Sequence, residues 1–264
     1  MNTVLSFYQD IVFRSWTVRN PDYILLAIHG IGAHSERWQY LGEYFKNAAV
    51  YAPELRGCGD NALPTPVYSF AKLRQDIAEM CDYIRQLYPK KKIILIGESM
   101  GGLIAFDYAL RQPNIAGLIC LSPAFKSLLK FRWYEYLLFP LLFIFPWLKI
   151  RIHFSAGMCT EDKKVQAKLK NDHRETRSVS GGLLIAILFA QLYCRCKARK
   201  LKAPILFQLA GQDKMVSTAV SKQVFKKIPA NKKMIVYSKS RHALSIEKNR
   251  NSIFRDIQKW AGSL

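Results

Sequence analysis

Residues 93–102 read Ile-Ile-Leu-Ile-Gly-Glu-Ser-Met-Gly-Gly, an apolar run that leads into a serine flanked by glycines. The apolar part predicts a buried strand and the residues after it predict a helix, so the G-x-S-x-G pattern falls at a strand-to-helix turn. Gly97 and Gly101 leave the space that a sharp turn requires. Such a turn exposes the hydroxyl of Ser99 at the amino end of a helix, where negative charge is stabilised. The alternative is a glycine-rich helix cap with an incidental serine.

On either side of this turn, short apolar runs alternate with amphipathic segments. This pattern is typical of a mainly parallel sheet with helices on both faces. Strands are predicted at residues 23–28, 49–51, 93–96, 116–121, 205–209 and 233–237. Helices are predicted at residues 36–45, 70–88, 101–111, 218–227 and 250–260. The residues before position 20 predict an opening antiparallel hairpin.

The alternation of strands and helices stops between residues 122 and 204. An excursion of this length between two core strands is too long for a loop. We therefore expect three parts: a first core part at residues 1–122, a mostly helical cap at residues 123–203, and a second core part at residues 204–264. The cap would lie over the carboxyl edge of the sheet, where open α/β sheets bind ligands.

The composition is globular, with 264 residues of which 50% are hydrophobic and 22% charged. The charge is strongly basic, because 40 Lys and Arg against 19 Asp and Glu give a net charge of +21. Such an excess attracts polyanions such as an anionic membrane surface or a nucleic acid, or it is simply spread over a solvated surface. No basic strand with interleaved aromatic residues is present, so we expect no nucleic-acid partner.

The cysteines and histidines predict neither a metal site nor a cofactor. Cys194 and Cys196 form a C-x-C that no second pair answers, and His34, His153 and His173 lack metal-ligand spacing. Free thiols in a chain of this size indicate a reducing compartment. The amino terminus lacks the basic start and long apolar run of a signal peptide. We therefore expect a cytoplasmic protein.

Residues 137–148 form an uncharged apolar segment, Leu-Leu-Phe-Pro-Leu-Leu-Phe-Ile-Phe-Pro-Trp-Leu. As a helix it would reach about 18 Å, which is short of the ~30 Å hydrocarbon core of a bilayer. Pro140 and Pro146 also interrupt it. The segment is therefore predicted to be an interfacial patch or a buried lid element rather than a membrane span. As an interfacial patch, it would attach the cap peripherally to an anionic membrane.

A serine nucleophile needs a base and an acid that orients the base, and at a turn of this kind they follow in the order serine, acid, histidine. Asp213 lies just after the strand predicted at residues 205–209, and His242 lies in the loop after the next strand. No other histidine follows Asp213. The alternatives are an ordinary turn aspartate and a surface histidine.

An oxyanion needs two hydrogen-bond donors beside the nucleophile. The N–H of Met100, directly after Ser99, supplies one. The loop after the strand at residues 23–28 contains two glycines, and we assign the second donor to the N–H of Ile31 in this loop. His29 is expected to brace the loop rather than to take part in catalysis.

These motifs together resemble the monoacylglycerol lipase and lysophospholipase group of α/β-hydrolases, which is of the serine aminopeptidase S33 type. The resemblance runs from about residue 20 to residue 262 and rests on HGIGAHS at 29–35, ELRGCG at 54–59, GESMGG at 97–102, GQD at 211–213 and HAL at 242–244. It implies the Ser99, Asp213 and His242 triad, an oxyanion amide at Ile31, and an apolar, membrane-facing cap. This sequence has Glu98 where many members have histidine, and Glu54 where aspartate is commoner.

The sequence thus predicts a serine hydrolase that cleaves carboxylic esters of lipids through an acyl-enzyme. The substrate would be a monoacylglycerol or a lysophospholipid, and the sequence leaves open which. A short-chain carboxylesterase, a thioesterase, an aminopeptidase and a non-catalytic binding protein with the same fold are the alternatives. The oligomeric state is also left open.

Overall fold

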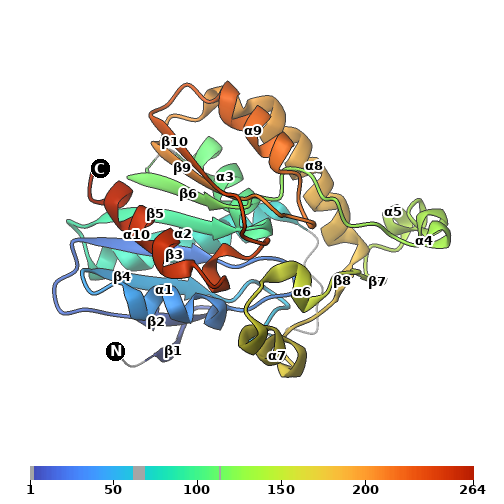
Figure 1. The fold of residues 1–264 in the computed structure, drawn as a ribbon, viewed down its shortest axis with the longest axis horizontal. Coiled ribbons are helices and arrows are strands. Elements are labelled where there is room, and N and C mark those ends of the chain that lie inside the picture. The colour runs from blue at the N-terminus through green and yellow to red at the C-terminus, as the bar shows by residue number, and fades with distance from the viewer. Residues whose placement is uncertain (1–2, 62–68, 113) are drawn as a thin grey trace.

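The computed structural model describes residues 3–61, 69–112 and 114–264. Eight strands form one sheet in the order β1-β2-β4-β3-β5-β6-β9-β10 (Figure 1). The strands are β1 (Val4–Tyr8), β2 (Ile11–Trp16), β3 (Tyr23–Ile28), β4 (Ala48–Pro53), β5 (Lys92–Glu98), β6 (Gly117–Leu121), β9 (Ile205–Ala210) and β10 (Lys232–Tyr237). β1 and β2 pair antiparallel, β2 pairs antiparallel with β4, and every pair from β4 to β10 is parallel. The predicted hairpin and the predicted mostly parallel sheet are both confirmed.

Helices cover both faces of this sheet. They are α1 (Gln39–Tyr44), α2 (Phe70–Leu87), α3 (Met100–Arg111), α9 (Thr218–Lys227) and α10 (Arg250–Ala261), with the 3₁₀ turns η1 (Ser35–Trp38) and η3 (Leu244–Ile246). Buried side chains of α2, α3 and α9 belong to the hydrophobic cluster on one face. Those of η1, α1 and α10 belong to the cluster on the other. The two layers fix the central strands between them.

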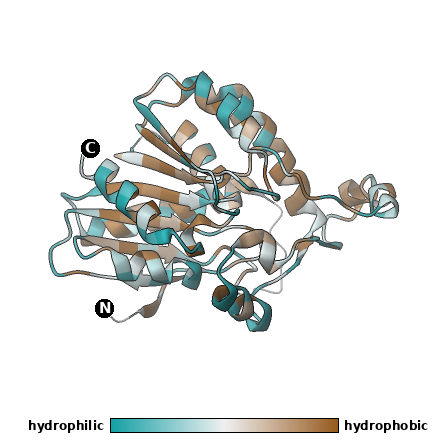
Figure 2. Cartoon of the chain, viewed as in Figure 1, coloured by the Kyte–Doolittle hydropathy of each residue, from teal (hydrophilic) through white to brown (hydrophobic). Residues whose placement is uncertain are grey.

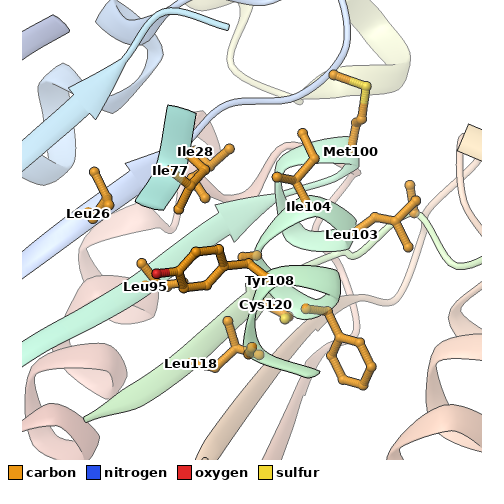
Figure 3. Packing of buried hydrophobic residues seen from close by; sticks show 14 of the residues in the cluster. Leu26, Ile28, Ile77, Leu95, Met100, Leu103, Ile104, Tyr108, Leu118 and Cys120 are labelled. Atoms are coloured by element: carbon orange, nitrogen blue, oxygen red, sulfur yellow. The ribbon is translucent and has the colours of Figure 1, made fainter. Parts of the chain in front are cut away.

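Strand β5 is buried on both faces, as its apolar sequence predicts. Ile93 and Leu95 point into the cluster beneath α2 and α3, and Ile94 and Ile96 point into the opposite one. Figure 3 shows Leu95 packed among side chains of the first cluster, which also contains residues of α3. The strand that leads to Ser99 is therefore packed on both faces.

The predicted helix at residues 36–45 is wrong in detail. Its first part is the 3₁₀ turn η1, and only its second part is the short helix α1. Arg37 N–H donates to His34 O, which tightens the turn, and the carboxylate of Glu54 accepts both the N–H and the hydroxyl of Ser35. These contacts hold the start of the segment in a tighter geometry than a regular helix.

Between β6 and β9 the chain leaves the sheet for residues 123–203, here called the insertion. It contains α4 (Trp133–Leu138), α5 (Leu141–Ile144), α6 (Ala156–Cys159), α7 (Lys163–Asn171), α8 (Gly181–Lys197), the 3₁₀ turn η2 (Ala198–Lys200) and the antiparallel strands β7 (Lys149–Arg151) and β8 (Ser178–Ser180). The strand pair was not predicted, because strands this short carry no periodic pattern. Figure 1 shows α4 and α5 set apart from the sheet at one end of the molecule.

By length and composition alone, one helical stretch among the described residues, Gly181–Lys200, could cross a membrane. A single stretch of this kind is weak evidence for a span, since the core helix of a globular protein passes the same test. In this structure α8 lies against α3, and Ala190 and Cys194 belong to the hydrophobic core. This packing buries one side of the helix, while Leu188, Phe189 and Leu192 remain exposed.

Candidate active site

Ser99 occupies the turn between β5 and α3. Its φ of 59° and ψ of −118° lie outside the regions that residues other than glycine normally adopt. The turn is anchored on both sides: Ser99 N–H donates to Leu121 O at 2.9 Å, and Ser99 O accepts from Leu103 N–H at 3.1 Å and from Ala124 N–H at 3.0 Å. The predicted strained strand-to-helix turn is confirmed, and its neighbours hold the strain in place.

The space around the turn permits only glycine on either side of the serine. A Cβ on Gly97 would collide with the carbonyl oxygen of Gly101, and a Cβ on Gly101 would collide with that of Ile28. The β3 and β5 backbones therefore approach the turn as closely as the sequence pattern predicted.

Asp213 and His242 meet at the same edge of the sheet, each in the loop that follows its strand, β9 or β10. Asp213 Oδ2 lies 2.8 Å from His242 Nδ1, and both side chains are buried. Asp213 Oδ1 accepts the N–H groups of Met215 and Val216 at 2.8 Å and 2.9 Å. The carboxylate is thus fixed on one side by backbone and orients the imidazole with the other.

Two opposing effects set the charge state of His242. Burial disfavours the imidazolium and lowers its pKa, but the negative charge of Asp213 and its hydrogen bond outweigh burial, so the pKa of His242 lies above the ordinary 6.5. Glu98 also raises this pKa and Arg37 lowers it. Nε2 of His242 is buried and has no hydrogen-bond partner among the described residues. In the neutral ring this atom is free to accept a proton.

Glu98 ties the loop that carries His242 to the turn that carries Ser99. Its Oε1 accepts the N–H of Ser245 at 2.9 Å and its Oε2 accepts the hydroxyl of Ser245 at 2.8 Å. Glu98 is buried, and burial raises the pKa of its carboxyl group. Since Glu98 directly precedes Ser99, and Ser245 lies shortly after His242, this clamp brings the two loops together.

The loop of residues 29–34 lies directly beside the nucleophile. A Cβ built on Gly30 would sit 3.7 Å from Ser99 Oγ. The N–H groups of Ile31 and Met100 have no acceptor within the part of the chain that the structure describes. Met100 is the first residue of α3, where N–H groups have no intrahelical partner. Two unengaged donors are therefore found in the segments where the sequence analysis placed them.

His29 braces this loop, as expected. Its Nε2 accepts the N–H of Leu55 at 3.0 Å, and its Nδ1 lies 2.8 Å from Gly30 O. Burial lowers the pKa of His29 to about 4. The ring is therefore neutral near pH 7, with the proton on Nδ1.

An apolar cavity of about 280 Å³ opens beside Ser99. Its walls come from the loop of residues 29–34, from α3, from the connections after β6 and β9, and from the insertion. Among the described residues no charged side chain lines it; the lining is Ile31, Ser99, Met100, Ala124, Ser127, Leu129, Phe131, Phe139, Leu142, Phe143, Ile152, Leu184, Ile185, Ile187, Leu188, Gln191, Met215 and Val216. The amide of Gln191 donates to Ala124 O at 2.9 Å, which occupies one of its two N–H donors.

Of the five residues predicted for the site, Ser99, Ile31 and Met100 line one cavity, and Asp213 and His242 form a hydrogen-bonded pair. Sequence reasoning noted Glu98 only as a departure from the family pattern and missed Ser245. The sequence did contain a signal for this contact: an acidic residue stands next to the serine in an otherwise apolar segment. A buried carboxylate requires hydrogen-bond partners, so a partner for Glu98 could have been expected.

These features together define an α/β-hydrolase: the strained serine turn after β5, the acid after β9 and the histidine after β10 on a mostly parallel sheet. A family model described as "Serine aminopeptidase, S33" matches residues 19–249, and the chain belongs to this family.

Three further comparisons place the chain among its relatives. It is 26% identical over 252 residues to phospholipase YtpA of Bacillus subtilis, covering 91% of this chain and 95% of that protein. It is 31% identical over 107 residues to human monoglyceride lipase, covering 39% of this chain and 35% of that protein. A crystal structure of Paleococcus ferrophilus monoacylglycerol lipase superposes with a TM-score of 0.83 at 20% identity, covering 95% and 97% of the two chains. This last likeness confirms the fold.

Proposed function

We propose that this protein hydrolyses carboxylic esters of lipids, with a monoacylglycerol or a lysophospholipid as substrate, through an acyl-enzyme on Ser99. The observation that carries the proposal is the position of Ser99: it lines an apolar cavity, and its turn is clamped to the loop of a buried Asp213–His242 pair. The similarity to a phospholipase and to monoglyceride lipases supports the same substrate class.

In the proposed acylation step, His242 Nε2 takes the proton of the Ser99 hydroxyl while the oxygen attacks the ester carbonyl carbon. The N–H groups of Ile31 and Met100 stabilise the negative charge on the carbonyl oxygen. Asp213 keeps the proton of the neutral ring on Nδ1 and stabilises the imidazolium that forms. His242 then protonates the departing alcohol as the carbon–oxygen bond to it breaks.

Deacylation uses the same groups in reverse. Water gives a proton to His242 Nε2 and attacks the acyl carbon, and the two amides again hold the oxyanion. When the bond to Ser99 breaks, the proton passes from His242 to the serine oxygen and the free fatty acid leaves.

The cavity favours an acyl chain as the bound group. Its lining is mostly apolar, and one N–H donor of the Gln191 amide is already bonded to Ala124 O. An aminopeptidase would need an acidic group to hold a free amine, and no such side chain lines the cavity among the described residues. We include in the proposal that residues 123–203 act as the cap of this cavity, between core parts at residues 1–122 and 204–264.

A series of p-nitrophenyl esters tests the acyl specificity. Each methylene that enters the cavity contributes ~0.8 kcal/mol, about fourfold in kcat/KM. We expect the octanoyl ester to exceed the acetyl ester by at least about 100-fold. Preference for acetyl would instead identify a short-chain carboxylesterase, and a faster reaction with octanoyl thioester would identify a thioesterase. Release of free fatty acid from monoacylglycerol and from lysophospholipid of equal chain length, measured side by side, decides the head group.

The cap also carries an exposed apolar surface, which we propose docks on an anionic membrane. Trp133, Leu137, Phe143 and Ile144 are 77%, 69%, 66% and 64% exposed. They lie on α4 and α5, the elements that stand away from the sheet in Figure 1 and are partly brown in Figure 2. Around them residues 126–151 contain one acidic residue and five exposed basic ones: Lys126, Lys130, Arg132, Lys149 and Arg151.

Vesicle sedimentation tests this docking. We expect stronger binding to phosphatidylcholine vesicles that contain phosphatidylserine than to phosphatidylcholine alone, and weaker binding as salt rises. The triple variant Trp133→Ser, Leu137→Ser, Phe143→Ser should bind at least about tenfold more weakly, because buried side chains of this size contribute ~1.5–3 kcal/mol each. Phe7→Ser is the matched control, since Phe7 is 70% exposed on β1. Equal binding by both variants, or indifference to salt, would overturn the docking surface.

A further inference from the structure

A short stretch of the cap crosses the loop that contains Ile31. Residues 172–177, here called the strap, connect α7 to β8. The loop itself is a tight turn, closed by Ala33 N–H donating to Gly30 O at 3.3 Å. Its third residue, Gly32, has a φ of +71°, which a turn of the type II form assigns to glycine.

The strap packs directly on this turn through backbone. Thr176 N–H donates to Gly32 O at 2.9 Å. A Cβ on Gly32 would collide with the carbonyl oxygen of Thr176, so the two segments are in contact without intervening side chains. The strap thus lies against the residue that follows Ile31.

Ion pairs of Arg37 and Arg174, together with contacts of the His34 ring, hold the strap to the residues that follow the turn. Glu175 makes a bidentate contact with Arg37, with Oε1 2.5 Å from Nε and Oε2 2.7 Å from Nη2, and both side chains are largely buried. His34 Nε2 lies 3.2 Å from Asp172 Oδ2 and 3.4 Å from Glu175 Oε1. Arg174 donates to Glu36 at 2.7 Å.

The loop of residues 29–34, here called the oxyanion loop, is therefore held from two parts of the molecule. Its start is braced by the core, where His29 accepts the N–H of Leu55. Its turn is held by the strap, which belongs to the cap. The residues after the turn are held both by the strap, through Glu175, and by the core, where Glu54 accepts the N–H and the hydroxyl of Ser35. A movement of the cap would therefore move the turn of the oxyanion loop as well.

We propose that the strap positions the Ile31 amide, so that the oxyanion hole is complete only while the cap is seated on the core. Glu175 and Thr176 are positioning residues in this scheme, since they act through the loop and do not touch the substrate. The inference rests on the proposed function, because it assumes that Ile31 N–H stabilises the oxyanion.

The test is Glu175→Gln, assayed with the octanoyl ester on enzyme whose reactive sites have been counted by complete fluorophosphonate labelling. Losing one oxyanion donor lowers kcat by about 10²–10³-fold. A displaced donor should lower kcat per labelled site by at least about tenfold and leave KM within about twofold, because the acyl cavity is unchanged. A merely structural role for Glu175 would reduce the number of labelled sites and leave kcat per site unchanged, which would overturn the proposal.

The matched control is Asp162→Asn. Asp162 pairs with Arg250 of the core at 3.2 Å and caps α7, a role that asparagine also performs. The control breaks a cap-to-core ion pair away from the oxyanion loop, and kcat per site should not change. An equal fall in kcat in both variants would show a general effect of cap attachment and would contradict a specific role for the strap.

A second pair of variants keeps the proposal testable if Glu175→Gln does not fold, since Arg37 would lose its buried partner. Gly32→Ala forces the strap off the loop, and Gly57→Ala imposes the same backbone strain at a φ of +75° with no atom within 4 Å of the added Cβ. We expect kcat per labelled site to fall in Gly32→Ala and to stay unchanged in Gly57→Ala. If the wild-type protein hydrolyses no ester, the proposed function fails; if it is active and Gly32→Ala matches Gly57→Ala, only the strap proposal fails.

Discussion

Replacing Ser99 with alanine lowers kcat/KM for the octanoyl ester by about 10³-fold or more. The hydroxyl oxygen of Ser99 is the only atom of the proposed machinery that forms a covalent bond to the substrate. Neither the two amides nor the cavity can replace it. Alanine adds no bulk to the turn, so the cavity should still bind substrate. Steady-state kinetics with the same ester measures the effect.

Ser122→Ala is the control for this variant. Ser122 lies just after β6, is buried, and also has a positive φ, of 40°. Its hydroxyl has no hydrogen-bond partner among the described residues. Loss of this hydroxyl should leave kcat/KM within about twofold. Residual turnover by Ser99→Ala above a tenth of the wild-type value would contradict the assignment of the nucleophile.

Asp213→Asn lowers kcat by about 10³–10⁴-fold. The backbone N–H groups of Met215 and Val216 need an acceptor at the position of Oδ1, so the amide nitrogen of the asparagine must face His242. A donor at that position requires Nδ1 to be unprotonated and moves the ring proton to Nε2. The imidazole then has no free nitrogen to accept the serine proton.

The pH profile separates this effect from misfolding. In the wild-type protein Asp213 raises the pKa of His242, so kcat/KM should rise with pH through a value above 6.5 as the imidazole loses its proton. Without the charge of Asp213, burial dominates and the pKa falls. The residual activity of Asp213→Asn should therefore have its acid limb at lower pH. An unchanged limb would show that Asp213 does not face the catalytic base.

Much of the fold followed from local pattern. The β-branched run before Ser99 favours a buried strand, and the glycines around the serine leave the room that a sharp strand-to-helix turn needs. Asp213 and His242 were found because parallel strands end at one edge of the sheet, so residues far apart in sequence meet there. In a sheet with helices on both faces, the strand order leaves only a few places where the ends of neighbouring strands bring distant residues together.

Other features depend on contacts that a single sequence does not reveal. The clamp between Glu98 and Ser245 and the ion pair between Arg37 and Glu175 join residues far apart in the chain, with no periodicity to signal either. The apolar run at residues 137–148 allowed both an exposed and a buried reading, because composition alone does not say which neighbours cover it. The structure leaves most of its large side chains exposed and buries Leu142.

Buried carboxylates and the strap hold the loops of the site in position relative to one another. One buried carboxylate, Glu98, joins the histidine loop to the serine turn, and another, Glu54, holds the start of η1 next to the oxyanion loop. Each accepts the N–H and the hydroxyl of one serine. Both of these contacts come from the core, and the strap adds contacts from the cap to the turn of the oxyanion loop.

The most direct measurement is the mass of the peptide that carries residue 99 after treatment with a fluorophosphonate and digestion. The account predicts one covalent adduct per chain, located on Ser99, formed rapidly in the wild-type protein and far more slowly in Asp213→Asn. No adduct should form in Ser99→Ala. An adduct on any other residue, or labelling of Ser99→Ala at the wild-type rate, would contradict it.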